Sequence, residues 1–192
     1  MAGTPLKLIV GLGNPDDEYA HTRHNAGFWF IDELARRHGG TLRYDSKHQG
    51  ELARARIGAH EIWLLKPMTY MNRSGGPTRS VANFYKVPVE EILVAHDELD
   101  FPPGVVKLKQ GGGAAGNNGI RDLIAQLGEP FWRLRIGVGK PPQTGIEHVL
   151  SRPSKAEERL IRETIAAAMD AVPIILEQGG QRAMNTLHTS KE

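Results

Sequence analysis

Short apolar runs of strand length alternate with longer amphipathic segments along this chain, and this alternation limits the fold more than any other feature of the sequence. The apolar runs cover residues 6–12, 61–67, 91–97, 105–109 and 132–139. Patterns typical of helices cover residues 25–38, 74–86, 118–128 and 155–178. Strands that alternate with helices predict an α/β fold, in which helices cover a β-sheet. Because the chain has 192 residues and no long linker, we expect a single domain over residues 1–192.

The composition is that of a soluble globular protein. Apolar residues make up 40% of the chain and charged residues 24%, as in folded rather than disordered proteins. No apolar run approaches the ~18 residues of a membrane-spanning helix, and no signal-peptide pattern begins the chain, so we expect a cytoplasmic protein with no membrane partner. The absence of cysteine excludes disulfides, thiolate zinc sites and a cysteine nucleophile.

The segment GGGAAGNNG, residues 111–119, has five glycines in nine positions and too few side chains to pack a core. Glycine permits positive φ angles and lets a ligand approach the main chain, which suggests phosphate binding. However, Asn117 and Asn118 stand where a P-loop has Lys and Ser or Thr. The Gly-x-Gly at residues 11–13 lacks the third glycine of a dinucleotide-binding fingerprint, which would fall at Asp16. Neither nucleotide-binding motif is therefore present.

Basic residues outnumber acidic ones between residues 101 and 140, although the net charge of the chain is only +2. The basic residues of this stretch are Lys107, Lys109, Arg121, Arg133, Arg135 and Lys140, and the acidic ones are Asp122 and Glu129. A local excess of positive charge suits a polyanionic partner such as a nucleic acid, and an ordinary solvated basic face is the alternative.

Two histidines precede the first helix, and a third stands next to an aspartate at the end of a predicted strand: His21, His24, His96 and Asp97. One interpretation is a metal site built from these four residues, but the spacing of the first two requires a helix where a loop is expected. Another is a His–Asp pair, in which Asp97 orients His24 while the imidazole deprotonates a water molecule. The helix N-terminus beside His24 favours the neutral imidazole that such a base requires. A histidine with no chemical role is the third interpretation, and no Gly-x-Ser-x-Gly motif supports a serine nucleophile.

Seven motifs in a fixed order resemble those of bacterial peptidyl-tRNA hydrolases. They are LIVGLGNP, TRHNAG, KPMTYMNRSG, FYKV, ILVAHDELDFPPG, GNNGIRD and RLRIGVG, and with NTLH at residues 185–188 they span nearly the whole chain. The resemblance implies a mixed, twisted β-sheet flanked by helices, with a mobile C-terminal helical segment at about residues 155–190. It also implies an enzyme that cleaves the ester between a nascent peptide and the 3′ end of tRNA, recycling tRNA from aborted translation. We expect a monomer that needs no cofactor and no metal.

The resemblance also assigns site residues by their positions in these motifs. His24 corresponds to the catalytic base and Asp97 to its partner. Asn14 and Asn72 correspond to amides that hold the peptide end and the scissile region. Of these two, Asn14 is assigned to the catalytic residues. The remaining correspondences are Tyr19 and Met71, which line the site, Asn118, which grips the tRNA acceptor end, and Lys109 and Arg135, which clamp the tRNA 5′ phosphate.

Ala114 and Asn117 depart from the family pattern, which has histidine at both of these positions in the glycine loop. In relatives the second histidine helps to position an amide in the cleft. Asn117 can donate and accept hydrogen bonds at a similar reach, but it cannot change charge near neutral pH. Because His24 and Asp97 are retained, we expect activity, with Asn117 as a further substrate-binding residue. The alternative is a catalytically weak or inactive RNA-binding relative that acts in RNA processing.

Overall fold

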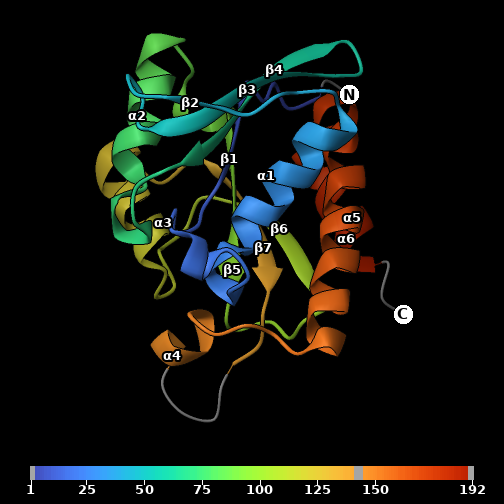
Figure 1. Cartoon of the computed structure of the whole chain (residues 1–192). Helices are drawn as coiled ribbons and strands as arrows, with labels where there is room; N and C mark the ends of the chain where they lie inside the picture. The colour runs from blue at the N-terminus through green and yellow to red at the C-terminus, as the bar shows by residue number, and fades with distance from the viewer. Residues whose placement is uncertain (1–2, 141–144, 190–192) are drawn as a thin grey trace.

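The computed structural model describes residues 3–140 and 145–189, and within them seven strands form one sheet (Figure 1). The strands are β1 (Leu8–Gly11), β2 (Arg43–Asp45), β3 (Gly50–Ile57), β4 (His60–Pro67), β5 (Ile92–Glu98), β6 (Val106–Gln110) and β7 (Trp132–Gly137). They lie in the order β2-β3-β4-β1-β5-β7-β6. The four central strands β4, β1, β5 and β7 are parallel, whereas β2, β3 and β6 pair antiparallel with their neighbours. The sheet is therefore mixed.

Helices cover both faces of the sheet. They are α1 (Ala26–Arg37), α2 (Gly75–Phe84), α3 (Asn118–Leu127), α4 (Gly145–Val149), α5 (Lys155–Gln178) and α6 (Gly180–Thr189). One buried apolar cluster joins α1, α5 and α6 to the sheet and another joins α2 and α3 to it, and Figure 1 shows these layers to the right and left of the strands. None of the described helices has the length and apolar character that crossing a membrane requires.

The predicted α/β class, with a mixed sheet flanked by helices, is confirmed by this arrangement. Each of the apolar runs overlaps a strand, and the last predicted helix is α5, whose N-terminus has a capping box formed by Ser154 and Glu157. The antiparallel strands β2 and β3 were not predicted. The sequence of β3, GELARARI, alternates alanine with arginine, and both residues favour helix over strand. Its alternation reflects burial of small side chains, which gives a weak hydrophobic signal.

The parallel strands place three connecting segments at one edge of the sheet. The register pairs Leu8 of β1 with Ile92 of β5 and with Trp63 of β4, so the three strands run in the same direction and end together. The chain leaves β1 toward two short 3-10 turns, η1 (Asp17–Tyr19) and η2 (Arg23–Asn25), and it leaves β4 toward a third, η3 (Met71–Arg73). Side chains that are far apart in the sequence therefore meet at this edge.

Gly27 allows α1 to lie directly against the backbone of the sheet. A Cβ atom at this position would be 2.5 Å from the carbonyl oxygen of Ala95 and 2.5 Å from the backbone nitrogen of Leu12. We predict that Gly27→Ala lowers the free energy of unfolding by at least about 1–3 kcal/mol, because the obstructing atoms belong to the backbone and cannot rotate away. Urea denaturation measures this change.

Gly40→Ala is the control for this substitution. The atoms nearest to a Cβ at Gly40 lie at 3.4 Å and beyond, which is ordinary van der Waals contact. The control should therefore keep nearly the wild-type stability. Equal stability of the two variants would show that α1 does not depend on the close approach at Gly27.

Candidate active site

A cavity of about 390 Å³ opens where the parallel strands end. Its lining residues are Asn14, His24, Tyr70, Met71, Asn72, Asp97, Glu98, Leu99, Ala115, Gly116, Asn117, Asn118, Val149 and Leu150. Among them are seven of the residues that the sequence predicts for the site, which are His24, Asp97, Asn14, Met71, Asn72, Asn117 and Asn118. The other three, Tyr19, Lys109 and Arg135, lie outside the lining.

His24 and Asp97 form a hydrogen-bonded pair in this cavity. The Nδ1 atom of His24, in η2, lies 2.8 Å from Oδ2 of Asp97, near the end of β5, and the Asp97 side chain is only 2% exposed. Because an ionised carboxylate only accepts hydrogen bonds, the Nδ1 atom of His24 carries the hydrogen and donates it. The lone pair of the neutral ring is then on Nε2, which can accept a proton from water.

The charge of Asp97 controls the protonation of His24. Burial lowers the pKa of His24, but the negative charge of Asp97 and the hydrogen bond to it together raise this pKa by more, so that it lies above its ordinary value. The helix N-terminus beside His24, which was expected to favour the neutral ring, does not set the direction of this shift. The carboxylate contacts the ring directly, and its full charge outweighs the partial charge of a helix end.

Asn14 is fixed by hydrogen bonds to two neighbouring segments. Its Oδ1 atom accepts a hydrogen bond from the backbone N–H of Met71 at 2.7 Å. Its backbone N–H donates to Oδ1 of Asn25 at 2.8 Å, and Nδ2 of Asn25 donates to the carbonyl of Asn14 at 3.0 Å. Since Oδ1 of Asn14 is occupied, the Nδ2 amino group is the donor that Asn14 can offer to a molecule in the cavity.

The turn η3 supplies another wall of the cavity, with Met71 buried and Asn72 exposed beside it. Tyr70, which precedes this turn, also lines the cavity, and its hydroxyl donates to Oδ2 of Asp16 at 2.7 Å. Tyr19, predicted to line the site, is instead half-buried in η1 and outside the lining. Tyr70 was missed, although its place beside Met71 in the KPMTYMNRSG motif was a usable signal.

The glycine loop is held by a buried arginine from β7. The guanidinium of Arg133 donates to the carbonyl oxygens of Gly112, at 2.7 Å, Gly113, and Glu129, at 3.1 Å. Arg133 is only 1% exposed, although the sequence groups it with the basic residues that suit a polyanion. A loop rich in glycine offers many carbonyl groups and few side chains, and Arg133 satisfies two of these carbonyls at once.

Asn117 connects the glycine loop to the His–Asp pair. Its Oδ1 atom accepts a hydrogen bond from the backbone N–H of Ile120 at 3.0 Å, which makes Asn117 the N-cap of α3. Its Nδ2 atom donates to Oδ1 of Asp97 at 3.1 Å. The neighbouring Asn118 is exposed and lines the cavity at the first residue of the helix.

Lys109 and Arg135 lie on the antiparallel pair β6–β7, beyond the cavity. Arg135 donates from Nε and Nη2 to Oε1 of the buried Glu98, at 2.9 and 2.7 Å, and its guanidinium lies over the ring of Phe101. Burial and then the positive charges of Arg135 and Arg133 lower the pKa of Lys109. We call Lys109 and Arg135 the basic strip. Glu98, which the sequence did not indicate, lines the cavity and also binds Arg135, so it joins the cavity to the basic strip.

Arg23 fastens the segment after α4 to the turn that carries His24. This buried arginine donates to the carbonyls of His148 and Arg152 at 3.3 and 3.1 Å, and to Oγ of Ser151 at 2.5 Å. It also forms an ion pair with Glu157 at 3.2 Å. The segment so held carries two apolar residues of the cavity wall, and only the place of Arg23 beside His24 could have indicated this role from the sequence.

The metal interpretation does not match the arrangement of the histidines. Within residues 3–140 and 145–189, no three His, Cys, Asp or Glu side chains are grouped as a metal site requires. His21 is exposed, whereas His96 is buried and donates from Nδ1 to the carbonyl oxygen of Asp97 at 2.8 Å. Burial lowers the pKa of His96 and so keeps it neutral.

An imidazole oriented by a carboxylate, with amide donors around it in an open cavity, suits a hydrolase that activates water by general-base catalysis. The comparisons with known proteins agree with this class. A sequence model of the family described as "Peptidyl-tRNA hydrolase" matches residues 8–192. The chain therefore belongs to the peptidyl-tRNA hydrolase family.

Individual relatives resemble the chain over almost its full length. A peptidyl-tRNA hydrolase of Alkalilimnicola ehrlichii is 51% identical over 189 residues, which are 96% of each chain. A peptidyl-tRNA hydrolase of Halorhodospira halophila is 52% identical over 186 residues, 95% of this chain and 96% of the relative. A crystal structure of peptidyl-tRNA hydrolase from Acinetobacter baumannii superposes with a TM-score of 0.94 at 45% identity, covering 98% of this chain and 97% of the other.

The raised pKa of His24 depends on the charge of Asp97, which leads to a direct test. We predict that His24 titrates above the ordinary histidine value of about 6.5 in the wild-type protein, and below it in Asp97→Asn. In the variant burial still disfavours the charged ring, but the compensating negative charge is gone. NMR titration of the imidazole resonances measures both values. An unchanged pKa in Asp97→Asn would show that Asp97 does not control the ring.

Proposed function

We propose that the protein hydrolyses the ester bond between a nascent peptide and the 3′ end of tRNA. The observation that carries this proposal is the hydrogen bond between His24 and Asp97 in a cavity lined by amide side chains. Membership of the family and relatives that are about half identical to the chain support the same activity. They do not favour the alternative of an inactive RNA-binding protein, and the retained His–Asp pair also argues against it.

In the proposed reaction His24 is the general base. Its Nε2 atom removes a proton from a water molecule, and the resulting hydroxide attacks the carbonyl carbon of the ester. The buried carboxylate of Asp97 stabilises the imidazolium that forms. The bond from the carbonyl carbon to the 3′ oxygen of tRNA then breaks, and the imidazolium returns a proton to this oxygen. The products are a free 3′ hydroxyl group and a peptide carboxylic acid, which loses its proton to solvent and becomes a carboxylate.

Amide donors around the base suit the charge that develops on the ester. The carbonyl oxygen becomes negative when hydroxide attacks, and hydrogen-bond donors fixed beforehand stabilise it most effectively. Asn14, whose Oδ1 is held by the backbone of Met71, can present its Nδ2 donor in a constant orientation. We assign Asn14 and Asn72 to the peptide end and the scissile region. Met71 forms an apolar part of the same wall, whereas Tyr19 lies outside the cavity lining.

The RNA part of the substrate is assigned to the part of the cavity lined by the glycine loop and Asn118. Asn118 and the exposed glycine loop are placed to hold the acceptor end of tRNA, since backbone and amide groups can bind a nucleotide without titrating. Lys109 and Arg135 are assigned to the 5′ phosphate, because they are cations on the strands next to the cavity. We expect the protein to act as a monomer in the cytoplasm, where its substrate arises from aborted translation.

Removal of the base tests the mechanism. We predict that His24→Ala lowers the rate of peptide release from peptidyl-tRNA by about 10²–10⁴-fold, the usual contribution of a general base, while tRNA affinity stays nearly unchanged. The measurement is release of labelled peptide under single-turnover conditions. The wild-type rate should fall at acid pH, below the raised pKa of His24, because the protonated ring cannot act as a base.

His21→Ala is the matched control, because this exposed histidine lies outside the cavity lining. It should retain the wild-type rate. Activity of the wild-type protein should also persist in the presence of a chelator, and inactivation by chelator would restore the metal interpretation. Wild-type turnover in correctly folded His24→Ala would remove His24 from the mechanism.

The salt dependence of tRNA binding tests the basic strip. We predict that Lys109→Gln weakens binding of all tRNAs alike and flattens the slope of log K against log[salt] by about 0.7–0.9, as expected for one lost phosphate contact. Arg135→Gln is best combined with Glu98→Gln. Among the described ion pairs, Arg135 is the one partner of the buried Glu98 carboxylate, so the single substitution would leave a buried charge unpaired.

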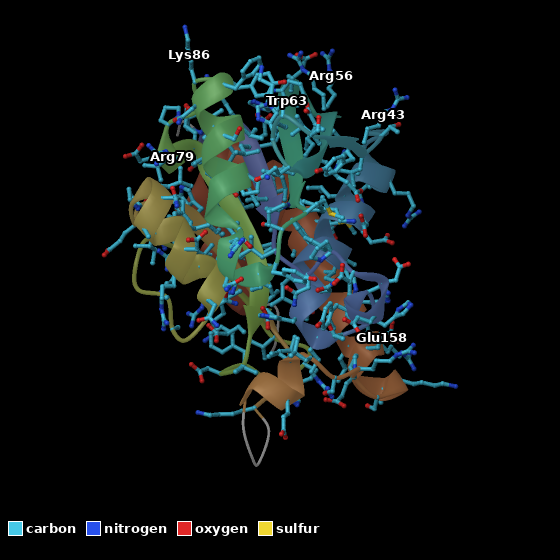
Figure 2. All side chains as sticks on the ribbon, turned by 60° about the vertical axis from the view of Figure 1, so that its left-hand side comes forward. Arg43, Arg56, Trp63, Arg79, Lys86 and Glu158 are labelled. Atoms are coloured by element: carbon cyan, nitrogen blue, oxygen red, sulfur yellow. The ribbon has the colours of Figure 1, made fainter. Side chains whose placement is uncertain are left out.

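Arg43→Gln is the control for charge. Arg43 lies on β2 at the other edge of the sheet, and Figure 2 shows its side chain pointing into solvent. Its replacement removes one positive charge, as Lys109→Gln does, but should leave the slope unchanged. Equal slopes for the wild-type protein and Lys109→Gln would place the 5′ phosphate elsewhere.

A further inference from the structure

Asn117 makes two hydrogen bonds that involve different parts of the protein. One end of its amide accepts from the backbone N–H of Ile120 and caps α3, and the other donates to the Asp97 carboxylate. The orientation of the amide is unambiguous. A backbone N–H can only donate and an ionised carboxylate can only accept, so both contacts require Oδ1 toward the helix and Nδ2 toward Asp97.

The hydrogen bond from Asn117 gives each oxygen of the Asp97 carboxylate a donor. Oδ2 of Asp97 accepts from Nδ1 of His24 at 2.8 Å, and Oδ1 accepts from Nδ2 of Asn117 at 3.1 Å. With a donor on each oxygen, the plane of the carboxylate cannot turn without breaking one of the two bonds. The ring of His24 is in turn oriented by this carboxylate.

The backbone of the glycine loop is shaped to deliver this side chain. Ala115 and Gly116 have φ angles of +49° and +79°, in the left-handed region, immediately before Asn117. A left-handed conformation is unfavourable for alanine. It persists here between the part of the loop that Arg133 holds and the helix cap that Asn117 forms.

We propose that Asn117 is a positioning residue for the reaction, which holds the Asp97 carboxylate so that His24 keeps its Nε2 atom directed to the attacking water. This inference rests on the proposed role of His24 as the base. It assigns Asn117 to the base rather than to the substrate. Because the amide is neutral, it supports the charge of Asp97 without adding a group that titrates near neutral pH. The same side chain also links the base to α3, whose first residue, Asn118, is assigned to the RNA end.

The two roles of Asn117 can be separated with a pair of substitutions. Serine is a good N-cap but too short to reach Asp97, so Asn117→Ser keeps the helix cap and loses the contact with the carboxylate. Asn117→Ala loses both. We expect both variants to lower kcat by about ten- to hundredfold with KM unchanged, since they leave one carboxylate oxygen without its partner. Asn117→Ala, which loses the helix cap as well, should lower the midpoint of urea denaturation by more than Asn117→Ser does.

Two further variants complete the comparison. Asn117→His should retain most of the wild-type kcat, because an imidazole N–H can donate to Asp97 in place of the amide. Asn83→Ser, at an exposed position of α2, is the matched control and should behave as the wild-type protein. The NMR resonance of the His24 Nδ1 proton gives a readout that does not depend on catalysis. It should exchange with water faster in Asn117→Ser than in Asn83→Ser, because Asp97 no longer has a fixed orientation.

These outcomes distinguish the inference from the function on which it rests. A wild-type kcat in Asn117→Ser would show that Asn117 is only a helix cap, and a raised KM with unchanged kcat would make it a substrate contact; either result would overturn the proposal. If the wild-type protein itself released no peptide, the proposed function would fail, whereas the exchange rate of the Nδ1 proton would still decide whether Asn117 holds Asp97.

Discussion

The parallel pairing of β1 with β4 and β5 is the constraint on which the site depends. Parallel neighbours must end at the same edge of a sheet, so the segments that follow these strands are brought together whatever their separation in the sequence. Asn14 follows β1, Met71 follows β4 and Asp97 lies near the end of β5, and all three line one cavity. The close approach of α1 at Gly27 keeps the adjacent turn, with His24, against the end of β5.

Two consecutive buried carboxylates at the end of β5 divide this edge into two regions. Adjacent side chains of a strand point to opposite faces, so Asp97 and Glu98 find different partners. Asp97 bonds to the imidazole of His24 and the amide of Asn117, whereas Glu98 bonds to the guanidinium of Arg135. A buried carboxylate needs such partners to stay ionised. One strand end therefore supports both the proposed base and the basic strip assigned to RNA.

The sequence was sufficient to predict features that depend on a pattern along the chain. It was less able to predict features that depend on which residues meet in space. Hydrophobic periodicity located the central strands and α5, and the resemblance to a known family singled out the pairing of His24 with Asp97 among the interpretations that the residues allowed. It could not show that the charge of Asp97 outweighs burial and raises the pKa of His24, since this depends on a contact distance. The burial of Arg133 could not be predicted from the sequence either. Its partners are main-chain carbonyls, which every residue has, so no particular residue type indicates them.

The anchoring of the glycine loop by Arg133 has a consequence for the energetics of binding. Glycine loses more conformational entropy than any other residue when it becomes ordered, and this loop is rich in glycine. Because Arg133 already fixes the carbonyls of Gly112 and Gly113 in the free protein, most of that entropy is lost during folding. A nucleic-acid end then meets a preorganised surface, and the affinity is not reduced by ordering the loop upon association. The entropy loss lowers the free energy of unfolding of the chain instead.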